Sequence, residues 1–134
     1  MFGKLQECDL LTTVLFYNTR KESELDLHLA GKVALVVASS KGLGKAIATQ
    51  LAMEGSDGML TSRDAEQLAI AREQVLRDAR GRVESCPCDI TRADEIEALV
   101  AVTRERLGPI NILINNAGGP PGGGFDQVDD AAWQ

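Results

Sequence analysis

The sequence predicts an α/β fold with a doubly wound parallel sheet that is truncated after its fourth strand. A continuous, valine-rich apolar run at 32–37 is typical of a strand buried on both faces. Strand-like and helix-like segments then alternate along the chain, which favours right-handed βαβ units. A glycine-rich turn at 38–44 separates the first strand from the first helix.

The first helix is expected over 45–54, with Gly55 ending it. Its predicted inner face consists of small and aliphatic residues, namely Ala46, Ile47, Leu51 and Ala52. A short second strand is expected over 59–62. Gly58 weakens this prediction, because glycine adds no packing and costs backbone entropy.

The second helix has the clearest pattern and is expected over 64–80, closed by Gly81. Asp64 and Gln67 form a start that resembles a capping box. The inner face of this helix is expected to contain Leu68, Ala71, Val75 and Ala79. A third strand is expected over 83–87.

A third helix and a fourth strand complete the pattern. Thr91 is expected to cap the helix, and Gly108-Pro109 ends it. The expected inner face is Ile96, Leu99, Val100, Thr103 and Leu107. Residues 110–114 predict a fourth buried strand, and 129–134 are typical of the first turn of another helix.

The composition indicates one globular domain. The 134 residues are 44% apolar and 25% charged, close to the globular average. The formal net charge of −6 argues against binding to nucleic acid or to an anionic membrane, because both need a basic face. No run approaches the roughly 20 apolar residues of a membrane span, and 10–17 lack the features of a signal peptide. We therefore expect a cytoplasmic protein.

The cysteines predict neither a disulfide framework nor a metal site. Cys8, Cys86 and Cys88 are an odd number without framework spacing. No second Cys or His pair follows Cys88 to complete a zinc site. The single histidine, His28, lies far away in the sequence.

The glycine-rich turn is a candidate nucleotide site. Glycine lets the backbone approach a pyrophosphate, and a helix N-terminus offers unpaired N–H groups with a partial positive charge. Gly42 and Gly44 alone would equally fit a plain strand-to-helix turn. The valine strand before them and the alanine-rich helix after them favour a Rossmann-type nucleotide-binding domain.

Two interpretations of the cofactor are open. Asp64 lies at about the distance at which an acid would hold the ribose 2′-hydroxyl of NAD, but it is also well placed as a helix cap. Arg63 and Lys41 could instead neutralise the 2′-phosphate of NADP. Solvated surface charge is the plain alternative for both basic residues. We favour NADP(H) over NAD(H).

Two motifs resemble those of the classical short-chain dehydrogenases/reductases. Residues 36–46 (Val-Val-Ala-Ser-Ser-Lys-Gly-Leu-Gly-Lys-Ala) resemble the glycine motif of that family, and 115–118 (Asn-Asn-Ala-Gly) are similar to its second signature. The closest similarity is to 3-oxoacyl-carrier-protein reductase-like members. The resemblance indicates a partial NADP-binding Rossmann domain at 25–134. Residues 1–24 match nothing in the family and are expected to be an extension.

The resemblance implies which residues bind the cofactor. The glycine motif would surround the pyrophosphate and the adenosine ribose, and Ser62 with Arg63 would select the 2′-phosphate. Asp89 and Ile90 would lie beside the adenine, although Asp89 would also fit a helix-flanking cap. The implied set is Ala38, Ser39, Ser40, Lys41, Gly42, Leu43, Gly44, Ser62, Arg63, Asp89, Ile90, Asn116, Ala117 and Gly118.

The sequence departs from the family pattern at three places. Ala38 stands where glycine is commoner, which is tolerable if its φ is negative. Ser56-Asp57-Gly58 stands where small and β-branched residues are expected, which puts the second strand in doubt. Asn111 replaces an aspartate just inside the fourth strand.

The resemblance also implies hydride transfer between a nicotinamide and a carbonyl or alcohol carbon of a small molecule. The catalytic Ser, Tyr and Lys of the family lie beyond the equivalent of Gln134, so no catalytic residue is assigned. Tyr17 and Lys21 share the family's four-residue spacing, but they precede the glycine motif, and we interpret this as coincidence. The chain alone is expected to be inactive, and the complete enzyme to be a homo-oligomer.

Two other interpretations stay open. The chain could be a non-catalytic nucleotide-binding or regulatory module that ends near Gln134, or a degraded reading frame without function. As given, the fourth strand would be an open edge whose apolar faces lose helix cover. We therefore expect the isolated chain to be marginally stable and prone to self-association.

Overall fold

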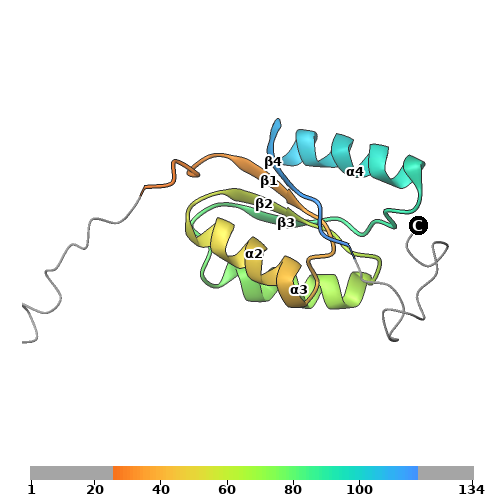
Figure 1. Ribbon diagram of the computed structural model, residues 1–134, viewed down its shortest axis with the longest axis horizontal. Coiled ribbons are helices and arrows are strands. Elements are labelled where there is room, and N and C mark those ends of the chain that lie inside the picture. The colour runs from red at the N-terminus through yellow and green to blue at the C-terminus, as the bar shows by residue number, and fades with distance from the viewer. Residues whose placement is uncertain (1–25, 118–134) are drawn as a thin grey trace, which may run out of the picture.

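The protein has the predicted α/β architecture, seen in a computed structural model that describes residues 26–117. Strands and helices alternate throughout these residues (Figure 1). Their bounds are β1 (Val33–Val36), α2 (Gly42–Met53), β2 (Asp57–Leu60), α3 (Ala65–Leu76), β3 (Val83–Ser85), α4 (Ala93–Arg106) and β4 (Ile110–Ile114).

The described strands form a parallel sheet in the order β3-β2-β1-β4. The chain therefore winds outward from β1 in one direction and then returns to add β4 on its other side. This reversal places α2 and α3 on one face of the sheet and α4 on the other (Figure 1). Because all strands run the same way, the loops that follow them gather at one edge of the sheet, the carboxyl edge.

Two apolar layers cover the two faces of β1. Ala34 and Val36 pack toward α2 and α3, whereas Val33 and Leu35 pack toward α4. All four residues of this strand are buried. Burial on both faces explains why the sequence of β1 is continuously apolar rather than alternating.

β2 forms even though Ser56, Asp57 and Gly58 stand where small and β-branched residues were expected. It begins at Asp57, two residues earlier than expected, and it includes Gly58, whose register partner is Val83 in β3. The buried Ser56 hydroxyl donates to the Lys32 carbonyl at 2.8 Å. These contacts start the strand, so that side-chain propensity is overridden by tertiary pairing.

The first two helices were predicted correctly in position but not at every residue. α2 begins at Gly42, inside the glycine-rich turn, and buries Gly44, Ala48 and Ala52, so Ala46 is exposed rather than inward-facing. α3 ends at Leu76, earlier than the predicted end at residue 80. The other expected inner residues, Ile47 and Leu51, are partly buried.

The predicted start of α3 is confirmed, and that of α4 is wrong. The Asp64 side chain accepts a hydrogen bond from the Gln67 N–H at 3.0 Å and caps α3. Arg92, not Thr91, is the N-cap of α4. The Thr91 hydroxyl instead donates a hydrogen bond to the Asp89 carboxylate. Ile96 was expected to face inward but is 40% exposed.

β4 has the predicted bounds, but within the described residues it pairs with β1 alone. The β1–β4 register shifts between Val33 and Ala34, and the Asn111 side-chain oxygen accepts the Val33 N–H at 2.9 Å. Asn111 thus supplies a ladder bond in place of a backbone carbonyl. Leu113 is 60% exposed, so this strand is less buried than expected.

Candidate functional site

The carboxyl ends of β1 and β4 define a topological switch point. From β1 the chain turns toward α2, whereas β4 lies on the other side of β1 and precedes the second motif. Ligands of open α/β sheets bind in the crevice at such a point. The structure brings the glycine-rich turn and Asn116 together there, although they are 78 residues apart in the chain.

The first turn of α2 presents its backbone toward this crevice. Lys41, the N-cap, is extended and makes no side-chain capping bond, and the first turn contains no acidic residue. Gly42 has a φ of +57°, which a side chain would make strained, and Leu43 is 69% exposed. Uncapped N–H groups at a helix N-terminus favour an anion such as a pyrophosphate.

Gly44 is required by a close approach. A Cβ at this position would clash with the backbone carbonyl oxygen of Ala38 and would lie 2.8 Å from Nδ2 of Asn116. Asn116 Nδ2 in turn donates to the carbonyls of Val37 and Ala38, both at 3.4 Å. Gly44 therefore lets α2 start directly against the end of β1 and the second motif.

Ala38 does not meet the condition under which its methyl group would be tolerated, which was a negative φ. Its φ is +51°, in the left-handed region that favours glycine. A side chain held there costs roughly 1–2 kcal/mol. The methyl group is thus accommodated with backbone strain at the first residue of the glycine-rich turn.

Ser39 points into the sheet rather than into the crevice. It is fully buried, and its hydroxyl bonds backbone groups of Val36 and Thr61 at the ends of β1 and β2. Its N–H donates to the Thr61 carbonyl at 3.0 Å. The next residue, Ser40, is half-buried. Sequence reasoning missed this role, because the partner is 22 residues away and no local pattern marks it.

The loop after β2 carries the candidate ribose-selecting residues. The Ser62 hydroxyl donates to the Asp64 carbonyl at 3.1 Å, and Arg63 is exposed. The Asp64 carboxylate is engaged as the α3 cap. Its engagement weakens the interpretation in which Asp64 holds a ribose hydroxyl, and it leaves Arg63 as the charged group at this position.

Asp89 and Ile90 follow β3 and are half-buried. Asp89 accepts hydrogen bonds from the Thr91 N–H at 3.0 Å and the Thr91 hydroxyl at 2.8 Å. These bonds lower the pKa of Asp89, and the positive charges of Arg63 and Arg92 lower it further. Asp89 therefore shapes the turn before α4, and it lies within electrostatic reach of Arg63.

The second motif is only partly described. Asn116 is half-buried and Ala117 exposed, whereas Gly118 lies outside the described residues. Asn115, the first residue of this motif, lines an apolar pocket of about 300 Å³ with Val37, Leu113 and residues of α4. This pocket lies on the α4 face of the sheet.

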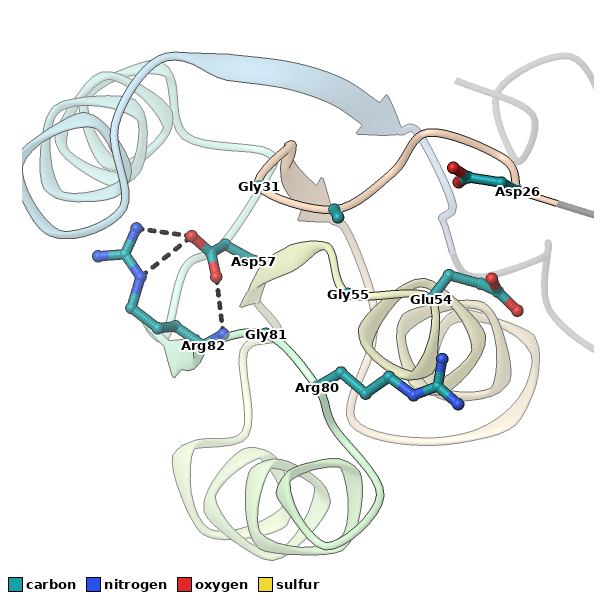
Figure 2. A pocket seen from close by; sticks show the side chains of 9 residues that line it. Asp26, Gly31, Glu54, Gly55, Asp57, Arg80, Gly81 and Arg82 are labelled. Carbon is teal, nitrogen blue, oxygen red and sulfur yellow. Dashed lines mark hydrogen bonds and ion pairs between the residues drawn. The ribbon is translucent and has the colours of Figure 1, made fainter. Parts of the chain in front are cut away.

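A larger, open pocket of about 740 Å³ lies at the opposite, amino edge of the sheet. Figure 2 shows Arg82 turned toward the Asp57 carboxylate at its rim. Arg82 also donates to the carbonyls of Arg106 and Leu107 at the end of α4, both at 3.0 Å. Because ligands of parallel α/β sheets bind at the carboxyl edge, this pocket is not the candidate site.

Within residues 26–117, no group of three or more His, Cys, Asp or Glu side chains is placed to hold a metal ion. None of the described helices is long and apolar enough to cross a membrane.

A doubly wound parallel sheet with a glycine-rich turn at its switch point defines a nucleotide-binding domain of the Rossmann type. Residues 32–134 match the family described as short chain dehydrogenase, and the chain belongs to this family. It is 39% identical over 102 residues to a provisionally named ketoacyl reductase of Streptomyces coelicolor. That match covers 76% of this chain and 39% of the relative.

Solved structures agree with the fold. The L-sorbose reductase of Gluconobacter frateurii, complexed with NADPH and L-sorbose, aligns with a TM-score of 0.69 at 31% identity, over 78% of this chain and 40% of that one. A variant of the actinorhodin polyketide ketoreductase with NADPH aligns with a TM-score of 0.67 at 36% identity, over 76% and 39%. The chain thus spans about 40% of the length of these relatives.

Proposed function

We propose that this chain is the N-terminal, cofactor-binding part of an NADP(H)-dependent oxidoreductase that acts on a small carbonyl or alcohol substrate. The observation that carries the NADP(H) preference is the loop after β2, where Asp64 is engaged as a helix cap and Arg63 is exposed. A guanidinium suits a phosphate better than a ribose hydroxyl. The NADPH in the two solved relatives supports the same preference.

The residues present fit such a cofactor. The pyrophosphate would lie against the uncapped first turn of α2, which Gly44 allows to start directly against the end of β1. Lys41 and Arg63 would neutralise the 2′-phosphate, and Asp89 with Ile90 would border the adenine. Ser40, Leu43, Asn116, Ala117 and Gly118 would line the remaining surface. The bound nicotinamide would supply or accept the hydride.

Within the family, we propose an activity like that of the 3-oxoacyl-carrier-protein reductases. The relative of Streptomyces coelicolor is itself named as a ketoacyl reductase. The catalytic Ser, Tyr and Lys would follow Gln134 in the same reading frame, and the complete enzyme would be a cytoplasmic homo-oligomer.

The cofactor preference is tested by replacing Arg63 with alanine. We expect the NADPH dissociation constant to rise roughly tenfold, as loss of one charge-assisted phosphate contact implies, and the NADH constant to change less than about twofold. Fluorescence titration of the full chain with each reduced cofactor measures both. Equal losses for the two cofactors, or no loss, would contradict the NADP(H) assignment.

The enzymatic assignment needs a separate test. Sequencing the source DNA beyond codon 134 should reveal an in-frame continuation with a Ser and a Tyr-x-x-x-Lys. An immediate stop codon would contradict the enzyme and leave the non-catalytic module or the degraded reading frame. NADPH binding by the chain would then favour the module over the degraded frame.

A further inference from the structure

A buried side chain adds hydrogen bonds between the ends of β1 and β2. Ser39 has no exposed surface, and its Oγ donates to the carbonyls of Val36 at 2.9 Å and Thr61 at 3.3 Å. The same oxygen accepts the Thr61 N–H at 2.9 Å. The Ser39 hydroxyl thus acts both as a donor and as an acceptor toward residues at the ends of the two strands. These bonds lie at the last β1–β2 register pair, Val36 and Leu60, and just beyond it.

The connection continues across the sheet to β3. The buried Thr61 hydroxyl donates to the Cys86 carbonyl at 2.7 Å, and the Cys88 N–H donates to the Ser62 carbonyl at 3.0 Å. The bonded residues immediately precede the segments that carry Arg63 and Asp89. A line of hydrogen bonds therefore joins the glycine-rich turn to the two loops that face it along the carboxyl edge.

The Ser39 hydroxyl is not needed to satisfy the backbone. The Thr61 N–H also donates to the Val36 carbonyl at 3.2 Å, and the Ser39 N–H donates to the Thr61 carbonyl at 3.0 Å. Removing Oγ would therefore leave no buried backbone donor unpaired. Its extra bonds instead restrict how the turn at Ala38, which is in the left-handed region, is oriented relative to the loop after β2.

We infer that Ser39 is a positioning residue that couples the glycine-rich turn to the Arg63 loop and thereby sets the discrimination between NADPH and NADH. The inference rests on the proposed NADP(H) function. One ligand would contact both segments at once, because its pyrophosphate would lie on the turn and its 2′-phosphate between Lys41 of the turn and Arg63 of the loop. A fixed distance between them benefits the phosphorylated cofactor, since only that cofactor uses the second contact.

The test replaces Ser39 with alanine in the full chain and measures both cofactors by fluorescence titration. We expect the NADPH dissociation constant to rise about fivefold, the equivalent of one net hydrogen bond, with the NADH constant nearly unchanged. In the Arg63→Ala background, Ser39→Ala should alter both constants by the same small factor. The ratio of the two affinities is a quantity that a general loss of stability would not change.

Ser56→Ala is the matched control. Ser56 is equally buried, and its hydroxyl also joins the β1 and β2 segments, but at the amino edge of the sheet through the Lys32 carbonyl. It should reduce the melting temperature by a similar amount and leave the NADPH-to-NADH ratio unchanged. If Ser39→Ala does not fold, Ser39→Cys, whose thiol bonds weakly, should give a partial loss of the same ratio.

The outcomes separate the two proposals. Equal weakening of both cofactors by Ser39→Ala, no change in either, or the same ratio change in Ser56→Ala would overturn the coupling while leaving the cofactor preference intact. A parent chain that binds NADPH no better than NADH would overturn the proposed preference itself, and the coupling with it, before any variant is compared.

Discussion

Ala38 shows how a single residue stores strain at the entrance to the candidate site. The chain leaves β1 with Ala38 in the left-handed region, and the surrounding bonds of Ser39 and Asn116 hold it there. Strained backbone persists where neighbouring contacts determine it, and such positions cluster at ligand sites. The cost of this conformation is therefore measurable by substitution.

Ala38→Gly is expected to raise the free energy of unfolding by about 1 kcal/mol, because glycine adopts a positive φ without the steric cost of a Cβ. Urea denaturation of the full chain measures it. Ala46→Gly is the matched control, since Ala46 is exposed in the interior of α2. That change should cost about 1 kcal/mol, so the same substitution has opposite signs at the two positions. If Ala38→Gly lowers the free energy of unfolding, the backbone at Ala38 is not strained.

At the scale of elements, Arg82 connects three parts of the fold. It binds Asp57 at the start of β2 (Figure 2). It lies just before β3 and donates to the carbonyls of Arg106 and Leu107 at the end of α4. A cation at a helix C-terminus is favourable because it satisfies carbonyls that have no partner within the helix. An ion pair thus reinforces the amino edge of the sheet, and the Ser39 hydroxyl adds hydrogen bonds at the carboxyl edge.

Asp57→Asn should destabilise the chain by about 2 kcal/mol at neutral pH, since it removes the charge from three hydrogen bonds donated by Arg82. The Asp57 side chain is only 13% exposed. Burial raises the pKa of Asp57, but the hydrogen bonds and charge of Arg82 outweigh it and lower the pKa below its ordinary 3.8. Urea denaturation from pH 7 to pH 2 measures the difference.

The sign of the pH effect follows from the lowered pKa. The contribution of Asp57 is fully present above its ordinary pKa of 3.8 and is lost as the pH falls through the lower value of the folded protein. The difference in the free energy of unfolding between the parent chain and Asp57→Asn should therefore disappear only below about pH 4. Glu73→Gln, in an exposed pair with Arg72, should cost less than about 0.5 kcal/mol. An equal difference in the free energy of unfolding at pH 7 and at pH 2 would exclude a stabilising role for the charge of Asp57.

At the scale of the whole molecule, the helices within residues 26–117 cover the two faces of the sheet unequally. α2 and α3 cover one face, whereas α4 covers part of the other, where Leu113 is exposed and an apolar pocket of about 300 Å³ adjoins β4. Exposed apolar surface beside a strand edge favours association. The expected self-association of the chain remains a prediction, and this face is where it should occur.

Leu113→Lys should reduce self-association of the chain, measured by sedimentation velocity across a tenfold range of concentration. A charge on the exposed face of β4 would have to be buried at the interface, which is unfavourable. Ile70→Lys is the matched control, because Ile70 is 48% exposed on α3, on the other face of the sheet. Equal effects of the two variants, or a monomeric parent chain, would refute the prediction.

The order of the elements and the place of the glycine-rich turn follow from the sequence alone. β1 is continuously apolar because both of its faces are buried, Asp64 caps α3 through a residue three positions away, and glycines mark the turns. Each of these signals lies within a few residues of the structure that it predicts. Local patterns of this kind are readable because the physical cause and the sequence neighbourhood coincide.

Only the tertiary structure decided how the site is held together. The hydroxyl of Ser39 bonds a residue 22 positions away, Arg82 bonds Asp57 25 positions away, and Gly44 faces Asn116 across the switch point. The positive φ of Ala38 likewise depends on contacts with other strands. Such contacts arise when the sheet brings distant segments together, and their energies depend on burial and geometry that no local pattern encodes.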